Sequence, residues 1–184
     1  MSKYVLASSS PRRKQLLEWA EIDFKIIVVP TEETYPGGLS PEEIAMHIAT
    51  QKAAAVKHKT NKTIIAADTI VVLGNEIIGK PKDRQDAINI LQKLSGQHHI
   101  VITGVVITNA NNTISFADTT DVEFHSLTTG QIEFYVDKYK PYDKAGAYAI
   151  QEWIGVIGIK KISGDFYNVM GLPVSRVVQA LTKF

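Results

Sequence analysis

Strand-like and helix-like segments alternate along the whole chain, and most of their boundaries carry a chemical signal. The clearest helix start is Ser40-Pro41-Glu42-Glu43, which matches a capping box and precedes apolar residues that share one helix face to about residue 58. A second helix is predicted from Pro11 to about residue 20, with Ser10 as its N-cap. Further helices are predicted at residues 83–94, 129–139 and 173–183.

Strands are predicted where Ile, Val and aromatic residues cluster between turn signals, at residues 3–7, 24–29, 63–73, 76–78, 99–109, 113–124 and 156–163. Gly74-Asn75 fits the two-residue turn of a hairpin. About seven strands interleaved with five helices predict an α/β fold of mixed α+β type, in which helices pack on a mixed sheet. We expect residues 1–184 to form a single domain.

The near-balance of charge excludes several classes of protein. The chain has 184 residues, with 20 Lys and Arg against 19 Asp and Glu, and a net charge of +1. Non-specific binding to nucleic acid or to anionic lipid depends on summed positive charge, so neither partner is predicted. No run of about 18 apolar residues predicts a membrane span. We recognise no targeting segment, and the lack of cysteine fits the reducing cytoplasm.

The common nucleotide-binding and nucleophile motifs are missing from the sequence. There is no P-loop, no dinucleotide fingerprint after a strand and no serine nucleophile elbow. The histidines do not pair at a helical metal-ligand spacing, and the adjacent His98 and His99 would point to opposite faces of a strand. Solvated or edge positions are therefore expected for the histidines.

Asp68 interrupts an otherwise apolar strand, Ile64-Ile65-Ala66-Ala67-Asp68-Thr69-Ile70-Val71-Val72. Burying a carboxylate costs free energy, so such a residue is usually paired, bound to a metal or catalytic. The alternative is that the run contains two strands with a turn at Asp68-Thr69, which Asp68 merely caps. We select Asp68 as the principal catalytic candidate.

A second candidate is the strand-to-helix junction Ala7-Ser8-Ser9-Ser10-Pro11-Arg12-Arg13. A helix N-terminus with unpaired N–H groups, hydroxyls and two guanidiniums suits an anion such as a phosphate. The alternative is an ordinary Ser-Pro helix cap with two solvated arginines.

Other polar residues carry two interpretations each. The loop segments Gly79-Lys80-Pro81, Asp143-Lys144-Ala145-Gly146-Ala147-Tyr148 with Gln151, and Gly164-Asp165-Phe166 fit plain turns as well as a binding site. Glu32 and Glu33, in the loop before the capping box, fit solvated acids unless a ligand recruits them. Lys52 on the long helix could simply extend its ammonium to water.

Taken together, these segments resemble the Maf family of nucleoside triphosphate pyrophosphatases. The matching pieces occur in family order from residue 7 to residue 173, which covers nearly the whole chain: Ala7-Ser8-Ser9-Ser10-Pro11-Arg12-Arg13, Lys52-Ala53, Ala67-Asp68-Thr69, Gly79-Lys80-Pro81, Leu94-Ser95-Gly96, Thr103-Gly104-Val105, Asp143-Lys144-Ala145-Gly146-Ala147-Tyr148 with Ile150-Gln151, and Gly171-Leu172-Pro173.

The resemblance implies a fold similar to that of inosine triphosphate pyrophosphatases, with a long twisted mixed sheet, flanking helices and two lobes around a cleft. It implies hydrolysis of a nucleoside triphosphate to the monophosphate and pyrophosphate with a divalent metal cation, Mg²⁺ or Mn²⁺. Asp68 would be the proton acceptor that activates water for attack at the α-phosphorus. The phosphates would be held by the loop from Ser8 to Ser10 and by Arg13, Lys52 and Lys80, and Lys144 would also bind the substrate. The metal would be placed by Glu32 or Glu33 with Asp68.

The resemblance also narrows the substrate. In the branch of the family that acts on dTTP and UTP, substrate choice is tied to three residues, which this sequence shares as Arg12, Thr69 and Gln151. The branch that acts on 7-methyl-GTP has SPWRR, Asp-Gln and Glu at the corresponding places. A neutral Gln can both donate to and accept from the edge of a pyrimidine. Glu152 departs from the family pattern, which commonly continues with Gly.

Two other functions remain as alternatives. A nucleotide-binding regulator of cell division and septum formation would bind a nucleotide without hydrolysing it, and would need a protein partner. A DNA-binding or RNA-binding protein is disfavoured by the charge balance. By analogy with the family, a homodimer is also expected.

Overall fold

The computed structural model describes residues 2–184 as a mixed sheet with helices on it. The strands are β1 (Tyr4–Leu6), β2 (Phe24–Ile26), β3 (Thr63–Leu73), β4 (Glu76–Ile78), β5 (His98–Thr108), β6 (Thr113–Phe124) and β7 (Ile159–Ser163). The helices are α1 (Pro11–Trp19), α2 (Pro41–Lys57), α3 (Arg84–Leu94), α4 (Thr129–Tyr139), the 3₁₀ turn η1 (Ala145–Ala147), α5 (Trp153–Gly158), α6 (Phe166–Met170) and α7 (Val174–Leu181).

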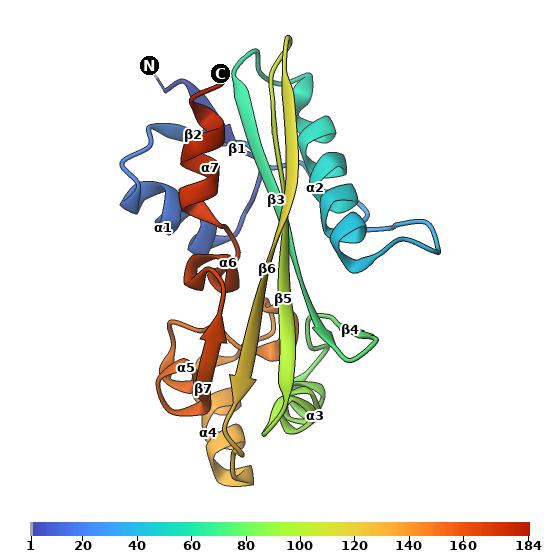
Figure 1. Cartoon of the computed structure of the whole chain (residues 1–184), viewed down its shortest axis with the longest axis vertical. Helices are drawn as coiled ribbons and strands as arrows, with labels where there is room; N and C mark the ends of the chain where they lie inside the picture. Colours follow the sequence, from blue (N-terminus) through green and yellow to red (C-terminus); the bar gives the residue numbers. More distant parts are fainter. Residues whose placement is uncertain (1) are drawn as a thin grey trace. The chain divides into compact units, whose positions relative to one another are not determined.

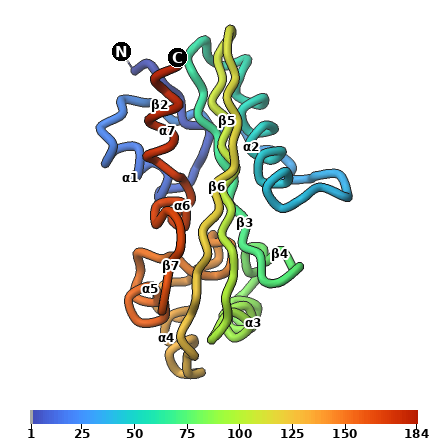
Figure 2. The backbone as a smooth tube through the Cα atoms, viewed as in Figure 1, coloured from blue at the N-terminus to red at the C-terminus, as the bar shows by residue number. Residues whose placement is uncertain are grey.

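The strands form a 7-stranded sheet in the order β2-β1-β3-β5-β6-β7, with β4 paired to β3. β1 runs parallel to β2 and to β3, whereas β4 is antiparallel to β3 and β7 is antiparallel to β6. The sheet is therefore mixed, as the sequence predicts. Figure 2 traces β5 and β6 side by side through the centre of the sheet.

The chain divides into two compact units. The first comprises the chain up to Thr69, Thr103–Asp118 and Gly171–Phe184, and the second comprises Ile70–Ile102 and Thr119–Met170. The long strands β3, β5 and β6 contribute residues to both units. Over residues 2–184, no helix is long and apolar enough to cross a membrane.

The core of the first unit forms between α2 and the strands β1, β3 and β5. The buried residues of this cluster are Val5, Ala7, Ala49, Ala53, Val56, Ile64, Ala66 and Val106. Gly104 lets α2 approach β5 backbone to backbone, because a Cβ at this position would lie 2.3 Å from the carbonyl carbon of Ala45. Figure 1 shows α7 on the opposite side of the long strands from α2, where Arg176 hydrogen-bonds to Asp118.

The second unit packs α3 against α4 and η1. Its interior holds an aromatic group in which the rings of His99, Phe124 and Tyr148 meet edge to face. The His99 Nε2 atom lies 2.7 Å from the Tyr148 hydroxyl. His98, the preceding residue on β5, is exposed, so the two histidines do point to opposite faces. The expectation that the histidines are solvated is wrong for His99, which is 1% exposed.

The predicted helix starts are confirmed. Ser40 and Glu43 form the capping box of α2, and Ser10 caps α1 with Pro11 in its first turn. The predicted strand at residues 156–163 is wrong over its first three residues, since α5 extends to Gly158 and β7 begins only at Ile159. β-branched residues favour a strand at this stretch, but the helix packs closely on the preceding loop. A Cβ at Gly155 would lie 1.7 Å from the Ile150 carbonyl oxygen, so only glycine fits there.

Candidate active site

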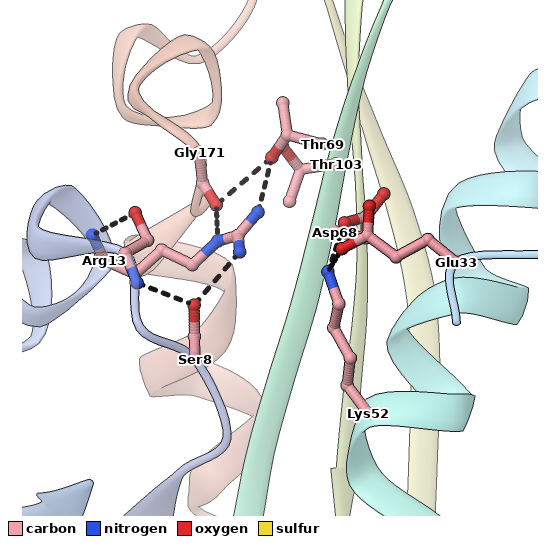
Figure 3. Close-up of polar contacts among 9 residues, drawn as sticks. Ser8, Arg13, Glu33, Lys52, Asp68, Thr69, Thr103 and Gly171 are labelled. Carbon is pink, nitrogen blue, oxygen red and sulfur yellow. Dashed lines mark hydrogen bonds and ion pairs between the residues drawn. The ribbon is translucent and has the colours of Figure 1, made fainter. Parts of the chain in front are cut away.

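Three charged side chains of the first unit meet at Lys52 (Figure 3). The Lys52 ammonium lies 2.6 Å from Asp68 Oδ1 and 2.8 Å from Glu33 Oε1. We call Glu33, Lys52 and Asp68 the acid–lysine cluster. The Asp68 and Lys52 side chains are 11% and 16% exposed, whereas the Glu33 side chain is 42% exposed. The cluster thus places two carboxylates around one cation at a partly open position.

Each member of the acid–lysine cluster is held by a different element. Asp68 lies in the middle of β3, which continues unbroken to Leu73, so the alternative of a turn at Asp68-Thr69 is excluded. Lys52 extends from α2, whose position is set by the close approach at Gly104. Glu33 belongs to the loop before α2, and Gln51 fixes this loop by donating a 2.9 Å hydrogen bond to the Thr34 carbonyl.

A second group of polar contacts surrounds the guanidinium of Arg13 (Figure 3). Its Nε donates to the Gly171 carbonyl at 2.7 Å, its Nη1 to Ser8 Oγ at 3.2 Å and its Nη2 to Thr69 Oγ1 at 2.9 Å. Thr69 Oγ1 lies a further 2.9 Å from Thr103 Oγ1. We call Ser8, Arg13, Thr69, Thr103 and the Gly171 carbonyl the arginine–threonine cluster.

Arg13 is an unusually enclosed cation. Burial lowers its pKa, and the neighbouring Asp68 carboxylate opposes that effect. The guanidinium still keeps its charge, since its pKa normally lies far above neutrality. Its planar fork instead ties together α1, β3 and the segment that precedes α7.

The two clusters lie on opposite sides of β3. Figure 3 shows Asp68 directed toward α2 and Thr69 directed away from it, as expected for successive residues of a strand. Because Asp68 and Thr69 are consecutive residues of β3, the two clusters are neighbours across this strand. The sequence Asp68-Thr69 thus supplies one residue to each cluster.

The remaining candidates of the first unit differ in their surroundings. Ser10 Oγ accepts the Arg13 backbone N–H at 3.5 Å and so caps α1, while Ser8 Oγ accepts the Ser10 N–H at 3.2 Å. Arg12 is half-buried on α1. Of the two candidate metal ligands in the loop before α2, Glu33 is the one that pairs with Lys52 of the acid–lysine cluster; the Glu32 side chain is exposed.

Lys80, Lys144 and Gln151 belong to the second unit. Gly146 N–H donates to the Gly79 carbonyl at 3.1 Å, which brings the segments of Lys80 and Lys144 together. Lys144 is buried, with its ammonium 2.8 Å from Asp143 Oδ1 and 3.6 Å from Glu152 Oε1.

The Glu152 carboxylate also accepts a hydrogen bond from the Tyr135 hydroxyl. Glu152, the departure from the family pattern, therefore serves as a counter-charge for Lys144. The side chains of Lys80 and Gln151 are exposed.

Comparison with known proteins identifies the family. A family model described as Maf-like protein matches residues 3–184. The chain belongs to the Maf family.

Curated members of this family are close in sequence. The chain is 51% identical to a protein of Cytophaga hutchinsonii named dTTP/UTP pyrophosphatase, over 97% of this chain and 83% of the relative. It is 49% identical to a protein of Phocaeicola vulgatus with the same name, over 98% of this chain and 95% of the relative. A Bacteroides thetaiotaomicron relative, again so named, is 45% identical over 100% of this chain and 97% of its own length.

Solved structures support the fold. The Ham1 protein of Staphylococcus aureus superposes with a TM-score of 0.54 at 20% identity, over 98% of this chain and 97% of that one. A HAM1 protein from Coxiella burnetii gives a TM-score of 0.54 at 17% identity, over 100% of both chains. At these identities the likeness shows a shared fold and no more.

The sequence gives no role to three residues that build the two clusters or support them. Thr103 and Gly171 enter only as parts of matching segments, and Gln51, which supports the loop of Glu33, is not indicated by any motif. A threonine in an apolar strand and a Gly before Leu-Pro are too common to signal a site. Their contacts depend on which strand lies beside β3 and on where the segment before α7 returns, and only the structure supplies these facts.

Proposed function

We propose that this protein hydrolyses dTTP and UTP to the corresponding monophosphate and pyrophosphate. The observation that carries the proposal is the acid–lysine cluster, in which a carboxylate on a buried strand is held by a lysine from a separate helix. Relatives named dTTP/UTP pyrophosphatase at 51% and 49% identity support the substrate class. They favour an enzyme over a regulator that only binds a nucleotide.

Asp68 accepts a proton from water in this mechanism. The water oxygen forms a bond to the α-phosphorus, its proton passes to the Asp68 carboxylate, and the bond from the α-phosphorus to the bridging oxygen breaks so that pyrophosphate leaves. Lys52 keeps the Asp68 carboxylate in one orientation and supplies positive charge beside it. Such a reaction depends chiefly on positioning and on neutralising phosphate charge.

We propose a divalent metal, Mg²⁺ or Mn²⁺, at Asp68 and Glu33. The residues fit such an ion, since both carboxylates already direct an oxygen at a single positive group. Magnesium commonly uses one or two protein carboxylates together with oxygens of the substrate phosphates. When bound, the metal neutralises phosphate charge. Over residues 2–184, no group of three or more His, Cys, Asp or Glu that could hold a metal ion is found.

The remaining assignments follow the family resemblance. We propose that the α1 N-terminus with Ser8, Ser10 and Arg13, together with Lys80 and Lys144, supports the triphosphate, and that Arg12 and Gln151 select the base. The capped N-terminus of α1, with the Arg13 guanidinium bonded to Ser8, supports the assignment of this region to phosphate binding. Location in the cytoplasm and assembly as a homodimer stay predictions from the sequence.

The test is a substrate profile of the purified protein. dTTP, UTP, CTP and 7-methyl-GTP are incubated with Mg²⁺ or Mn²⁺, and pyrophosphate is measured. We expect kcat/KM for dTTP and for UTP to exceed kcat/KM for CTP and for 7-methyl-GTP by at least about tenfold. Absence of release from both dTTP and UTP would contradict the proposal, and nucleotide binding without hydrolysis would favour the regulator.

A further inference from the structure

Gln151 lies in a tight turn between η1 and α5, which we call the Gln151 turn (residues 149–152). The turn closes with a 3.1 Å hydrogen bond from the Glu152 N–H to the Ala149 carbonyl. The side chain of Gln151 is exposed, whereas the preceding residue, Ile150, is 4% exposed. The turn therefore presents the Gln151 amide at the surface of the second unit.

One buried hydroxyl holds both ends of the Gln151 turn. It belongs to Tyr135, which lies on α4 and is 0% exposed. The hydroxyl accepts a 3.2 Å hydrogen bond from the Ala149 N–H and donates to the Glu152 carboxylate. A backbone N–H only donates and a carboxylate only accepts, so the direction of both bonds is settled by the partners. The first and last residues of the turn are thereby tied to α4.

Two further contacts restrict the Gln151 turn. The ring of Trp153, the first residue of α5, meets the ring of Phe134 on α4 edge to face, with centroids 4.8 Å apart. In addition, a Cβ at Gly155 would lie 1.7 Å from the Ile150 carbonyl oxygen, which shows how closely α5 packs on the turn. The chain is therefore held on both sides of Gln151 while the amide itself stays accessible.

We propose that Tyr135 and Glu152 are positioning residues for Gln151, and that they set the preference for the base through it. This inference rests on the proposed function, in which Gln151 selects the base. The pairing edges of uracil and cytosine carry opposite donor and acceptor patterns, and an amide on a loosely held turn could adjust to either one. Glu152 thus has a role besides its pairing with Lys144, because it supplies the acceptor through which Tyr135 holds the end of the turn.

The ratio of kcat/KM for UTP to kcat/KM for CTP, the UTP to CTP ratio, isolates this role. Both nucleotides carry the same triphosphate, so a change in how Lys144 meets the phosphates cancels in the ratio. Tyr135→Phe removes only the hydroxyl, and Glu152→Ala removes the carboxylate that this hydroxyl binds. Glu152→Gln is the conservative variant, because its amide oxygen can still accept a hydrogen bond from Tyr135.

Thr120→Val is the matched control for the loss of a buried hydroxyl. Thr120 is 0% exposed on β6 and belongs to the second unit. Its hydroxyl also makes two hydrogen bonds: it donates to the Asp165 carbonyl at 3.0 Å and accepts from the Asn168 amide at 3.0 Å. Neither partner belongs to the Gln151 turn, so this substitution should lower the melting temperature without changing the UTP to CTP ratio.

Positioning predicts a loss of base preference with little loss of turnover. We expect Tyr135→Phe and Glu152→Ala to lower the UTP to CTP ratio about fivefold or more, with kcat for UTP within about threefold of wild type. Glu152→Gln and Thr120→Val should keep the ratio within about twofold of wild type. If Tyr135→Phe does not fold, the comparison of Glu152→Ala with Glu152→Gln decides, because the Glu152 side chain is 22% exposed and its loss is better tolerated.

Three results would overturn the inference. The first is a folded Tyr135→Phe or Glu152→Ala enzyme with the wild-type UTP to CTP ratio. The second is a Glu152→Gln enzyme whose ratio falls as far as that of Glu152→Ala, because the acceptor for Tyr135 would then not be what matters. The third is an equal fall in Thr120→Val. A wild-type protein that hydrolyses neither UTP nor dTTP is a different outcome, which would overturn the proposed function and the inference with it.

Discussion

Lys52 Nζ lies 2.6 Å from Asp68 Oδ1, and both side chains are largely removed from water, at 16% and 11% exposure. An ion pair at this depth is screened less than one on the surface. If the Lys52 ammonium were removed, the Asp68 and Glu33 carboxylates would both lose the cation with which they pair. The two residues are therefore expected to depend on each other for stability as well as for activity.

Lys52→Met is expected to lower kcat/KM for UTP by about a hundredfold and the free energy of unfolding by about 1–3 kcal/mol. Lys93→Met is the matched control, because it breaks an ion pair with Glu76 whose side chains are 52% and 58% exposed. Exposed pairs contribute little, so this variant should resemble wild type in both respects. Steady-state kinetics and urea unfolding check the comparison. Equal effects of the two substitutions would contradict a special role for Lys52.

The fold was largely predictable because its boundaries are marked locally. Capping residues lie next to the helices that they begin, so Ser10 and Ser40 identify α1 and α2 without knowledge of the rest of the fold. The stretch at residues 153–158 has no such signal. Its N-cap position makes no side-chain hydrogen bond, its β-branched residues favour a strand, and the close approach of Gly155 to the Ile150 carbonyl is a tertiary contact that the local sequence does not indicate.

Gly104→Ala should destabilise the first unit. The added Cβ would lie 2.3 Å from the Ala45 carbonyl carbon and 2.4 Å from the Met46 nitrogen, both backbone atoms of α2, so the helix would have to move. We expect a loss of about 3 kcal/mol in the free energy of unfolding. Lys52 lies on the same helix, so activity should fall as well. Denaturant unfolding with steady-state kinetics measures both effects.

Gly130→Ala provides the control for that substitution. Gly130 lies in the first turn of α4 and has no heavy atom within 4 Å of the position of a Cβ. Alanine there should leave stability unchanged or raise it slightly, because Ala restricts the unfolded chain more than Gly does. If Gly104→Ala behaved in the same way, the close approach of α2 and β5 would be disproved.

His99 should make the stability of the protein depend on pH. Burial, with a smaller contribution from His98, lowers the pKa of His99 from 6.5 to about 4. The unfolded chain therefore binds a proton below pH 6.5 that the folded chain does not bind until about pH 4. The stability due to neutral His99 is complete above pH 6.5 and is lost as the pH falls toward 4, by about 3 kcal/mol in total.

Urea unfolding of wild type and of His99→Gln from pH 7.5 to pH 4 measures this contribution. The variant cannot titrate at this position, so its free energy of unfolding should fall less steeply with pH. His125→Gln, which replaces an exposed histidine, should keep the wild-type slope. Identical slopes for all three proteins would show that His99 is not the source of the dependence.

The site was predictable only in part. Asp68 is evident from the sequence because a carboxylate in an apolar strand requires a reason. Its partners are less evident: Lys52 is 16 residues earlier, and Glu33 approaches through a loop whose path depends on Gln51. The arginine–threonine cluster is harder still, since it joins Arg13 to Gly171 across 158 positions of sequence.

The most direct test of the mechanism is the fate of the attacking oxygen. Hydrolysis of dTTP in ¹⁸O-labelled water is followed by mass spectrometry of both products. Attack at the α-phosphorus places one ¹⁸O atom in thymidine monophosphate and none in pyrophosphate. Asp68→Asn, which cannot accept the proton, should lower the rate of labelling by about 10²–10⁴ while the protein remains folded. Label in pyrophosphate, or an Asp68→Asn protein with wild-type rate, would contradict the mechanism.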